Sequence, residues 1–129
     1  MSKSTNEPVS RDELRELLRR WQAALIDEKA VHETAEAWTD RYPEKLPTYP
    51  HTDPRSIADE VLSQLEILDA QLITPEDVPA LLAFLETPTG QEQAGWNRYQ
   101  RYWDGVDFNQ RIRELADIPY YSKSTPPTR

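Results

Sequence analysis

Residues 53–86 of the chain, DPRSIADEVLSQLEILDAQLITPEDVPALLAFLE, decide the fold, because they hold its densest run of leucine, isoleucine and valine. In the first half of this stretch, apolar residues recur every three or four positions, which places them on one face of a helix. Asp53 and Pro54 are typical of a helix start, since the aspartate accepts free N–H groups and the proline loses no hydrogen bond there. The predicted buried face consists of Ile57, Val61, Leu65, Leu68 and Leu72, widened by Leu62 and Ile67.

A second helix is expected to follow almost directly, with Thr74 as its cap, Pro75 as its first residue and an end before Pro88. Pro79 removes an N–H group from its second turn, so we expect a tight or kinked start. Because the joint is so short, the two helices should lie roughly antiparallel. The inward face of this second helix is Val78, Leu81, Leu82 and Leu85.

The N-terminal part of the chain predicts one or two further helices. Ser10 and Glu13 have the spacing of a capping box, in which each side chain binds the backbone N–H of the other residue. Asp27 is typical of the cap of a second helix that runs to about Tyr42, although a single helix through Asp27 is also compatible with the sequence. The buried face of the first helix is predicted to be Leu14, Leu17, Leu18, Trp21 and Leu25.

Four prolines in residues 43–54 predict an extended surface loop, because proline interrupts helices and donates no hydrogen bond to a sheet. Residues 89–92 again have a capping pattern and introduce a helix with aromatic side chains on one face. Asp107 is expected to cap a short last helix with Phe108, Ile112 and Leu115 inward.

The sequence therefore predicts an all-α protein, a compact bundle of about five or six helices with a proline-rich loop after the second helix. We expect residues 1–9 to be a disordered N-terminus, residues 10–118 a single helical domain and residues 119–129 a flexible C-terminal tail.

Composition excludes several classes of protein. The chain of 129 residues has no cysteine, which excludes disulfides, thiolate metal sites and thiol catalysis and suits a cytoplasmic protein. It has no apolar run long enough for a membrane span, and its first residues lack the apolar core of a secretory signal. With only three glycines, it offers no glycine loop for a phosphate, and we expect no cofactor.

Charge is distributed unevenly along the chain. Residues 53–92 contain nine acidic side chains and one basic side chain, which equals the whole net charge of −8. A strongly acidic surface repels nucleic acids and anionic membranes and attracts basic proteins. We therefore expect the helix pair of residues 53–86 to bind a basic partner protein through whichever carboxylates face outward. The candidates are Asp59, Glu60, Glu66, Asp69, Glu76 and Asp77.

His32 is the candidate for an alternative function, a small enzyme or metal-binding protein. Glu28, Glu36 and Asp40 lie four or eight residues from it and would share its side of a helix. Such a column of ligands could hold a metal or transfer protons. The spacing differs from the HExxH pattern of zinc enzymes, so we expect no metal, no catalytic residue and no enzymatic activity.

The aromatic helix offers a third possibility. Trp96 and Trp103, with Tyr99 between them, fall on one helical face and the arginines on another, as expected for a helix that packs on a core. This separation argues against stacking on nucleic acid. Because tryptophan, tyrosine and arginine dominate binding hot spots, Trp96 and Trp103 are candidate interface residues, and a homodimer through this helix would make the chain a structural subunit.

In outline the chain resembles the colicin-type immunity proteins, which are small, acidic, helical bacterial proteins. The resemblance lies in two short amphipathic helices between Leu14 and Trp38 that meet at Leu25-Ile26-Asp27, followed by the acidic helix pair. It implies a cytoplasmic bacterial protein that covers the basic active surface of a toxin. The chain is also similar to uncharacterised families of helical bacterial proteins, for which the resemblance implies no function.

Overall fold

A computed structural model describes residues 9–41 and 49–122 of the protein. Over these residues the chain forms eight α-helices, six of them eight residues or longer, and no strand, which confirms the predicted all-α bundle. No helix among them is both long enough and apolar enough to cross a membrane. The elements are α1 (Arg11–Gln22), α2 (Glu28–Thr39), α3 (Arg55–Glu66), α4 (Leu68–Gln71), the 3₁₀-helix η1 (Pro75–Asp77), α5 (Val78–Leu85), α6 (Glu92–Asp104), α7 (Phe108–Leu115) and α8 (Pro119–Ser122).

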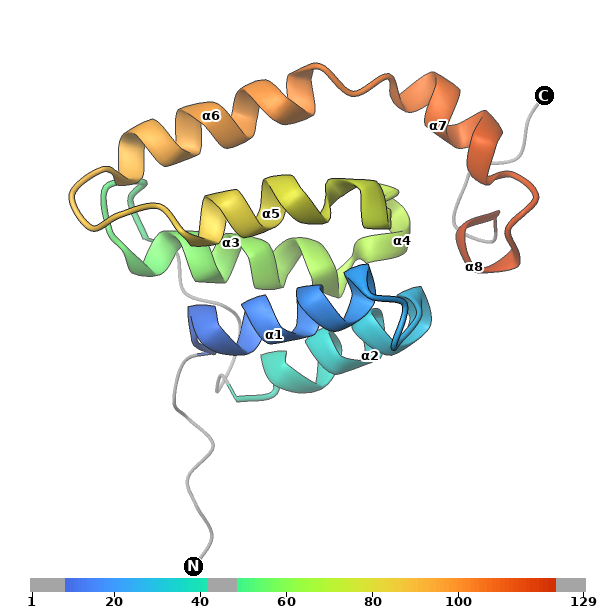
Figure 1. Ribbon diagram of the computed structural model, residues 1–129, viewed down its shortest axis with the longest axis horizontal. Helices are drawn as coiled ribbons and strands as arrows, with labels where there is room; N and C mark the ends of the chain where they lie inside the picture. The colour runs from blue at the N-terminus through green and yellow to red at the C-terminus, as the bar shows by residue number, and fades with distance from the viewer. Residues whose placement is uncertain (1–8, 42–48, 123–129) are drawn as a thin grey trace, which may run out of the picture.

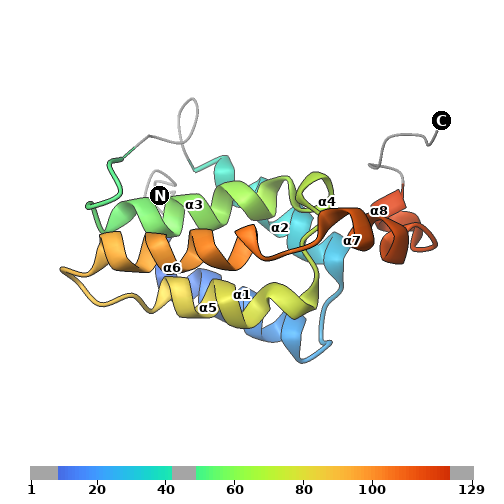
Figure 2. The ribbon, with the colours of Figure 1, turned by 90° about the horizontal axis from the view of Figure 1, so that it is seen from above.

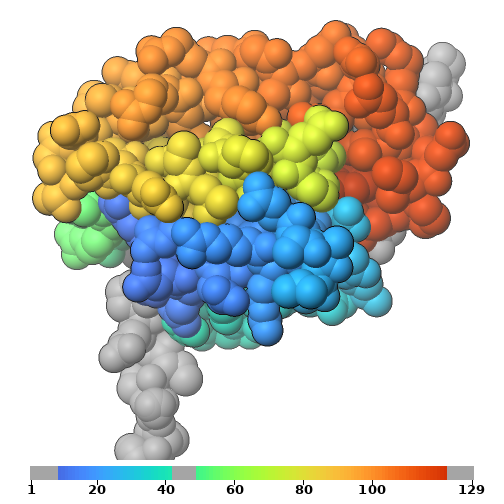
Figure 3. Space-filling model, in the orientation of Figure 1, coloured from blue at the N-terminus to red at the C-terminus, as the bar shows by residue number. Residues whose placement is uncertain are grey.

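The helices lie in three levels around an antiparallel pair, α3 and α5 (Figure 1). Below this pair, α2 packs on α3 and α1 packs on α5, while α6 lies above and contacts α5. Figure 2 shows α6 lying between α3 and α5 when the molecule is seen from above, so α6 covers the top of the core. The space-filling view confirms that α6 and α7 form one edge of the molecule and α1 the opposite edge (Figure 3).

The core is filled by the apolar faces that the sequence predicts for these helices. Leu14, Val31, Ile57, Leu65 and Leu81 are all fully buried, so each of the helices α1, α2, α3 and α5 contributes its stripe. Burying one such side chain stabilises the folded state by roughly 1.5–3 kcal/mol, which makes these stripes the main source of cohesion.

Capping side chains begin α1 and α2 separately, in agreement with the prediction of two helices in the N-terminal part of the chain. The Ser10 hydroxyl accepts the Glu13 N–H at 3.1 Å, and the Glu13 carboxylate accepts the Ser10 N–H at 2.9 Å. Asp27 accepts the Ala30 N–H at 3.0 Å and begins α2. Two helices therefore replace the single long helix that the sequence also allowed.

The helix predicted to extend through Leu72 is interrupted, which corrects the sequence analysis. α3 ends at Glu66, Ile67 leaves the helical conformation with φ −119° and ψ 38°, and α4 follows as a single turn. Ile67 is 44% exposed and therefore does not widen the buried face, whereas Leu68 and Leu72 are buried. The break turns the chain so that it can reverse direction within a few residues into α5.

The start of the second central helix also differs in detail. A 3₁₀ turn precedes α5, in agreement with the tight start expected from Pro79. The Thr74 hydroxyl has no hydrogen-bond partner among the described residues; instead the Thr74 N–H donates to the Asp77 carboxylate at 2.9 Å. Thr74 stands at the cap position and Pro75 follows it, as predicted, and the Asp77 side chain binds back to the cap residue.

Gly95 lets α6 approach the end of α5 closely. A Cβ atom on Gly95 would lie 2.3 Å from the Thr87 hydroxyl oxygen, which donates to the Phe84 carbonyl at 2.7 Å. Thr87 is itself buried, so a larger residue at position 95 would force the two helices apart.

The predicted domain boundaries need two corrections. Val9, expected in a disordered N-terminus, is buried, and residues 119–122, expected in a flexible tail, form α8. Tyr121 on α8 is almost completely buried and its hydroxyl donates a hydrogen bond to the Ile73 carbonyl. The remaining parts of those two predictions, and most of the proline loop, fall on residues 1–8, 42–48 and 123–129, which lie outside the described residues.

Candidate functional site

Asp77, a predicted partner-binding residue, lies in the interior, which corrects that prediction. It is fully buried and forms a two-point ion pair with Arg111 of α7, with nitrogen–oxygen distances of 2.7 and 3.1 Å. The Tyr102 hydroxyl also donates to it, and burial followed by this hydrogen bond raises the pKa of Tyr102 to about 12. Arg111 donates as well to the Leu72 carbonyl at 3.0 Å. The cluster joins four segments of the chain and has a structural role.

The other predicted acidic residues do not form one face either. Asp59 is buried, and Glu60 is half-buried and accepts a hydrogen bond from Gln64 at 2.6 Å. Glu66 and Asp69 are half-buried, and only Glu76 is exposed. The structure therefore excludes Asp59 from any outward acidic face and leaves Glu76 as the accessible member of the predicted set.

The aromatic helix uses most of its tryptophan surface internally. The Trp96 indole N–H donates to the Ser56 hydroxyl at 2.9 Å, and its ring stacks on His51 with centroids 3.8 Å apart. Trp103 stacks on Phe108, with centroids 6.0 Å apart. Both tryptophans are half-buried, so they contribute to the packing of α6 and offer only part of their surface to a partner.

Carboxylates do gather, but on α2 and α4 rather than on α3 and α5. Burial first, and then the negative charges of Asp69, Glu36, Glu28 and Glu33, raise the pKa of Tyr120 on α8. Four carboxylates from two helices are thus close enough to act on one hydroxyl group. We call this set, Glu28, Glu33, Glu36 and Asp69, the acidic surface.

His32 lies at the centre of the acidic surface and contacts α8. Its Nδ1 is hydrogen-bonded to the Tyr120 hydroxyl, its Nε2 lies 3.3 Å from Glu36, and Asp69 lies 3.9 Å from Nδ1. The histidine therefore links α2 to α8. The metal-binding alternative finds no ligand set here, since within residues 9–41 and 49–122 no group of three or more His, Asp or Glu side chains could hold an ion.

The turn between α1 and α2, residues 23–27, exposes an apolar side chain that was predicted to be buried. Ala24 has φ 63°, and the Leu25 N–H donates back to the Arg20 carbonyl at 2.9 Å, which closes α1 in a Schellman-type end. In such an end the residue in the position of Leu25 commonly packs on the helix. Here Leu25 is instead 73% exposed, and this corrects the predicted stripe.

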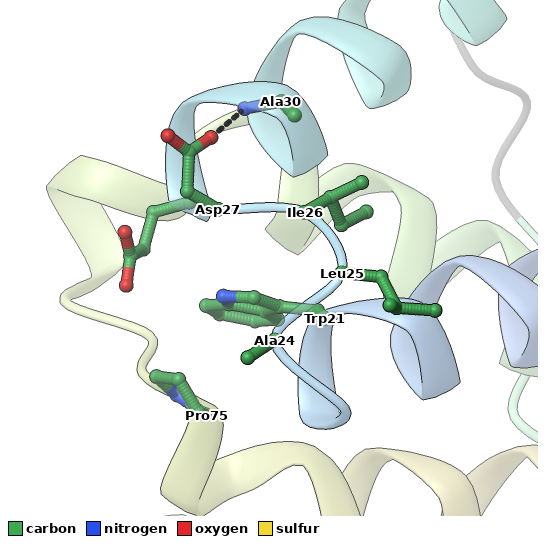
Figure 4. A pocket seen from close by; sticks show the side chains of 8 residues that line it. Trp21, Ala24, Leu25, Ile26, Asp27, Ala30 and Pro75 are labelled. Atoms are coloured by element: carbon green, nitrogen blue, oxygen red, sulfur yellow. Dashed lines mark hydrogen bonds between the residues drawn. The ribbon is translucent and has the colours of Figure 1, made fainter.

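Two hollows lie near the turn; Leu25 lines the first, and its neighbour Ile26 lines both. The first, which we call the turn pocket, has a volume of about 620 Å³ and is shown in Figure 4. There the Trp21 ring lies between Pro75 and the turn, and the Leu25 side chain points away from it. The second, which we call the helix groove, has a volume of about 390 Å³ and lies between α1 and α2, with Leu17, Ile26, Ala30 and Trp38 among its lining residues. Ile26 and Ala30 line both hollows.

The sides of the two hollows are mainly acidic. Asp27 and Glu28 line the turn pocket, and Glu28 also belongs to the acidic surface. Three carboxylates and one basic side chain line the helix groove, namely Asp12, Glu13, Glu16 and Arg20. Apolar floors beside carboxylates are able to hold a ligand that is both apolar and basic.

Sequence reasoning missed Leu25 and Tyr120 as surface features. Leu25 continues the heptad-like stripe of α1, so only the left-handed backbone at Ala24 reveals that it turns outward. Tyr120 stands in a short segment after Pro119 with no periodic pattern, and the one available signal was the pair of adjacent tyrosines.

Comparisons of the chain with protein-family models, with curated proteins and with solved structures find no match to any of the three.

Proposed function

We propose that the protein is a non-enzymatic interaction module that binds a basic partner protein through the acidic surface. The observation that carries this proposal is the meeting of α2 and α4 at His32, which lies 3.3 Å from Glu36 and 3.9 Å from Asp69, on a helix that also carries Glu28 and Glu33. α2 contains a single lysine, Lys29, which lies 3.8 Å from Glu33 and offsets only part of this charge. An immunity protein that covers the basic surface of a toxin would be one such module, acting in the cytoplasm.

The physical basis of the proposal is electrostatic steering. A patch of like charge raises the rate at which an oppositely charged protein associates, and salt screens the effect over a Debye length of about 8 Å at physiological ionic strength. The dissociation rate depends more on close contacts and should respond less. Binding to the true partner should therefore slow as salt rises.

The experiment compares two matched charge reversals. Glu33 and Glu36 are mostly exposed and three residues apart on α2, so Glu33→Lys with Glu36→Lys reverses the centre of the acidic surface. Glu114→Lys with Asp117→Lys reverses two exposed acids at the same spacing near the end of α7. Proteins retained from a lysate of the native host by the wild type and by the α7 variant, but lost from the α2 variant, are the expected partners.

The association rate of a retained protein is then measured at several salt concentrations. We expect the rate to fall by about tenfold or more between low and physiological salt, as for steered complexes, and to lose most of this dependence in the α2 variant. A partner whose association rate ignores both salt and the α2 reversal would refute the proposal.

A further inference from the structure

The exposed Leu25 and the two hollows beside it form a docking site, and this inference rests on the proposed function because it specifies the partner. We propose that the turn pocket and the helix groove together bind a basic, amphipathic segment of another protein. In this arrangement apolar side chains of the segment contact Leu25 and enter the two hollows, and its basic side chains face the carboxylates Asp27 and Glu28.

The shape of the site supports a segment rather than a small molecule. The turn pocket, of about 620 Å³, and the helix groove, of about 390 Å³, accommodate several large apolar side chains. Leu25 lines the turn pocket and has 73% of its surface exposed. An exposed leucine beside an apolar hollow is complementary to an amphipathic helix, which carries apolar residues at spacings of three and four.

Charge selects the occupant. Asp27 and Glu28 line the turn pocket, and no basic side chain is among its described lining residues, whereas the carboxylates of the helix groove are paired: Asp12 with Arg15, Glu13 with Arg41 and Glu16 with Arg20. Glu28 makes the turn pocket continuous with the acidic surface of α2. An acidic apolar segment would be repelled by these carboxylates, and a neutral one would not be attracted by them. A basic apolar segment gains both the burial of its apolar side chains and electrostatic attraction.

The test is a selection of binding peptides from a displayed library of random sequences, followed by measurements on the selected peptides. We expect the selected sequences to combine lysine or arginine with large apolar residues at helical spacing. In Leu25→Ser their affinity should fall by at least about tenfold, the effect of losing one central apolar contact. In the control Ile67→Ser, which removes an exposed apolar side chain elsewhere on the surface, the affinity should be unchanged.

Indole N–H resonances of the four tryptophans give a second readout that does not depend on affinity. The signals of Trp21 and Trp38, which line the two hollows, should move on peptide binding, and those of Trp96 and Trp103 should not. Selected peptides that are acidic, that bind Leu25→Ser as tightly as the wild type, or that move only the Trp96 and Trp103 signals would overturn the inference. A library that yields no binding peptide would also overturn it.

Two further outcomes separate this inference from the proposed function and from self-association. If Leu25→Ser leaves binding of the native partner unchanged while reversal of Glu33 and Glu36 still slows it, the docking site is wrong and the proposed function stands. If neither change has an effect, both fall. A dimer in light scattering that Leu25→Ser dissociates would assign the hollows to a second copy of this chain and overturn the proposal.

Discussion

The buried ion pair of Asp77 and Arg111 joins the 3₁₀ turn before α5 to α7. Removing one partner of such a pair leaves the other charge uncompensated in the interior. Arg111→Met should therefore lower the free energy of unfolding by about 3–5 kcal/mol, measured by urea denaturation. Lys29→Met, which removes the exposed pair of Lys29 and Glu33, should cost less than about 0.5 kcal/mol.

The combined change Asp77→Asn with Arg111→Met supplies the control. Asparagine keeps an oxygen for the Thr74 N–H and carries no charge, so the double variant should recover part of the stability lost in Arg111→Met. If Arg111→Met costs less than about 1 kcal/mol, then Asp77 is not held as an ion in the interior and the structural role given to it is wrong.

Glu13 shows how a surface ion pair makes stability depend on pH. Its hydrogen bonds from Arg41, at 2.9 and 2.6 Å, lower the pKa of the carboxyl to about 2, against the opposing effect of burial. Because the folded-state pKa lies below the unfolded value of about 4.5, the stabilisation is complete above pH 4.5 and disappears as the pH falls toward 2.

Glu13→Gln should accordingly be less stable than the wild type by about 1 kcal/mol at pH 7, a figure kept small because the pair is partly exposed. The two proteins should approach the same free energy of unfolding as the pH is lowered from 4.5 to 2 in a series of urea titrations. A difference that stays constant across this range would show that the Arg41 contact does not shift the pKa of Glu13.

Among the elements, the turn that ends α1 carries a conformational cost. Ala24 has φ 63°, a conformation in which glycine loses nothing but a Cβ is crowded. Ala24→Gly should raise the free energy of unfolding by about 0.5–1 kcal/mol in thermal or urea denaturation. Ala23→Gly, at the neighbouring position with φ −84°, is the matched control and should give no gain. A gain in both variants, or in neither, would mean that left-handed strain at Ala24 is not the cause.

Elements that depend on local patterns were predicted well from the sequence, and elements that depend on distant contacts were not. The starts of α1 and α2 follow from Ser10, Glu13 and Asp27, whose hydrogen bonds lie within three residues. The break at Ile67 and the helix α8 have no such signal. α8 is held by the Tyr121 contact with Ile73, which is 48 residues away in sequence. The acidic surface could not be predicted for the same reason, because the carboxylates that act on Tyr120 come from α2 and α4, which are distant from it in the sequence.

Across the whole molecule, a count of charges along the sequence proved a poor guide to the charge of the surface. Residues 53–92 carry the entire net charge, yet Asp59, Asp77 and Glu92 from this stretch are buried. The Glu92 carboxylate accepts the Gly90 N–H, and Asp53 is paired with Arg55 at 2.7 Å. Much of that charge therefore stabilises helix starts and turns, and three of the four carboxylates of the acidic surface come from α2, outside residues 53–92.

This arrangement predicts that salt has opposite effects on folding and on binding. The carboxylates of the acidic surface repel one another in the folded state, and the protein as a whole carries a net charge of −8. Screening should relieve this repulsion, so sodium chloride should raise the free energy of unfolding by about 0.5–1 kcal/mol between low ionic strength and roughly 0.5 M. The same salt should slow association with a basic partner.

Glu33→Gln with Glu36→Gln separates this effect from a general influence of salt on protein stability. The variant lacks two of the four carboxylates in the acidic surface, so its stability should respond less to sodium chloride than that of the wild type. Glu114→Gln with Asp117→Gln, which neutralises as much charge near the end of α7, should keep the larger response. Equal salt responses in all three proteins, followed by urea denaturation, would show that the carboxylates of α2 and α4 do not act as one surface.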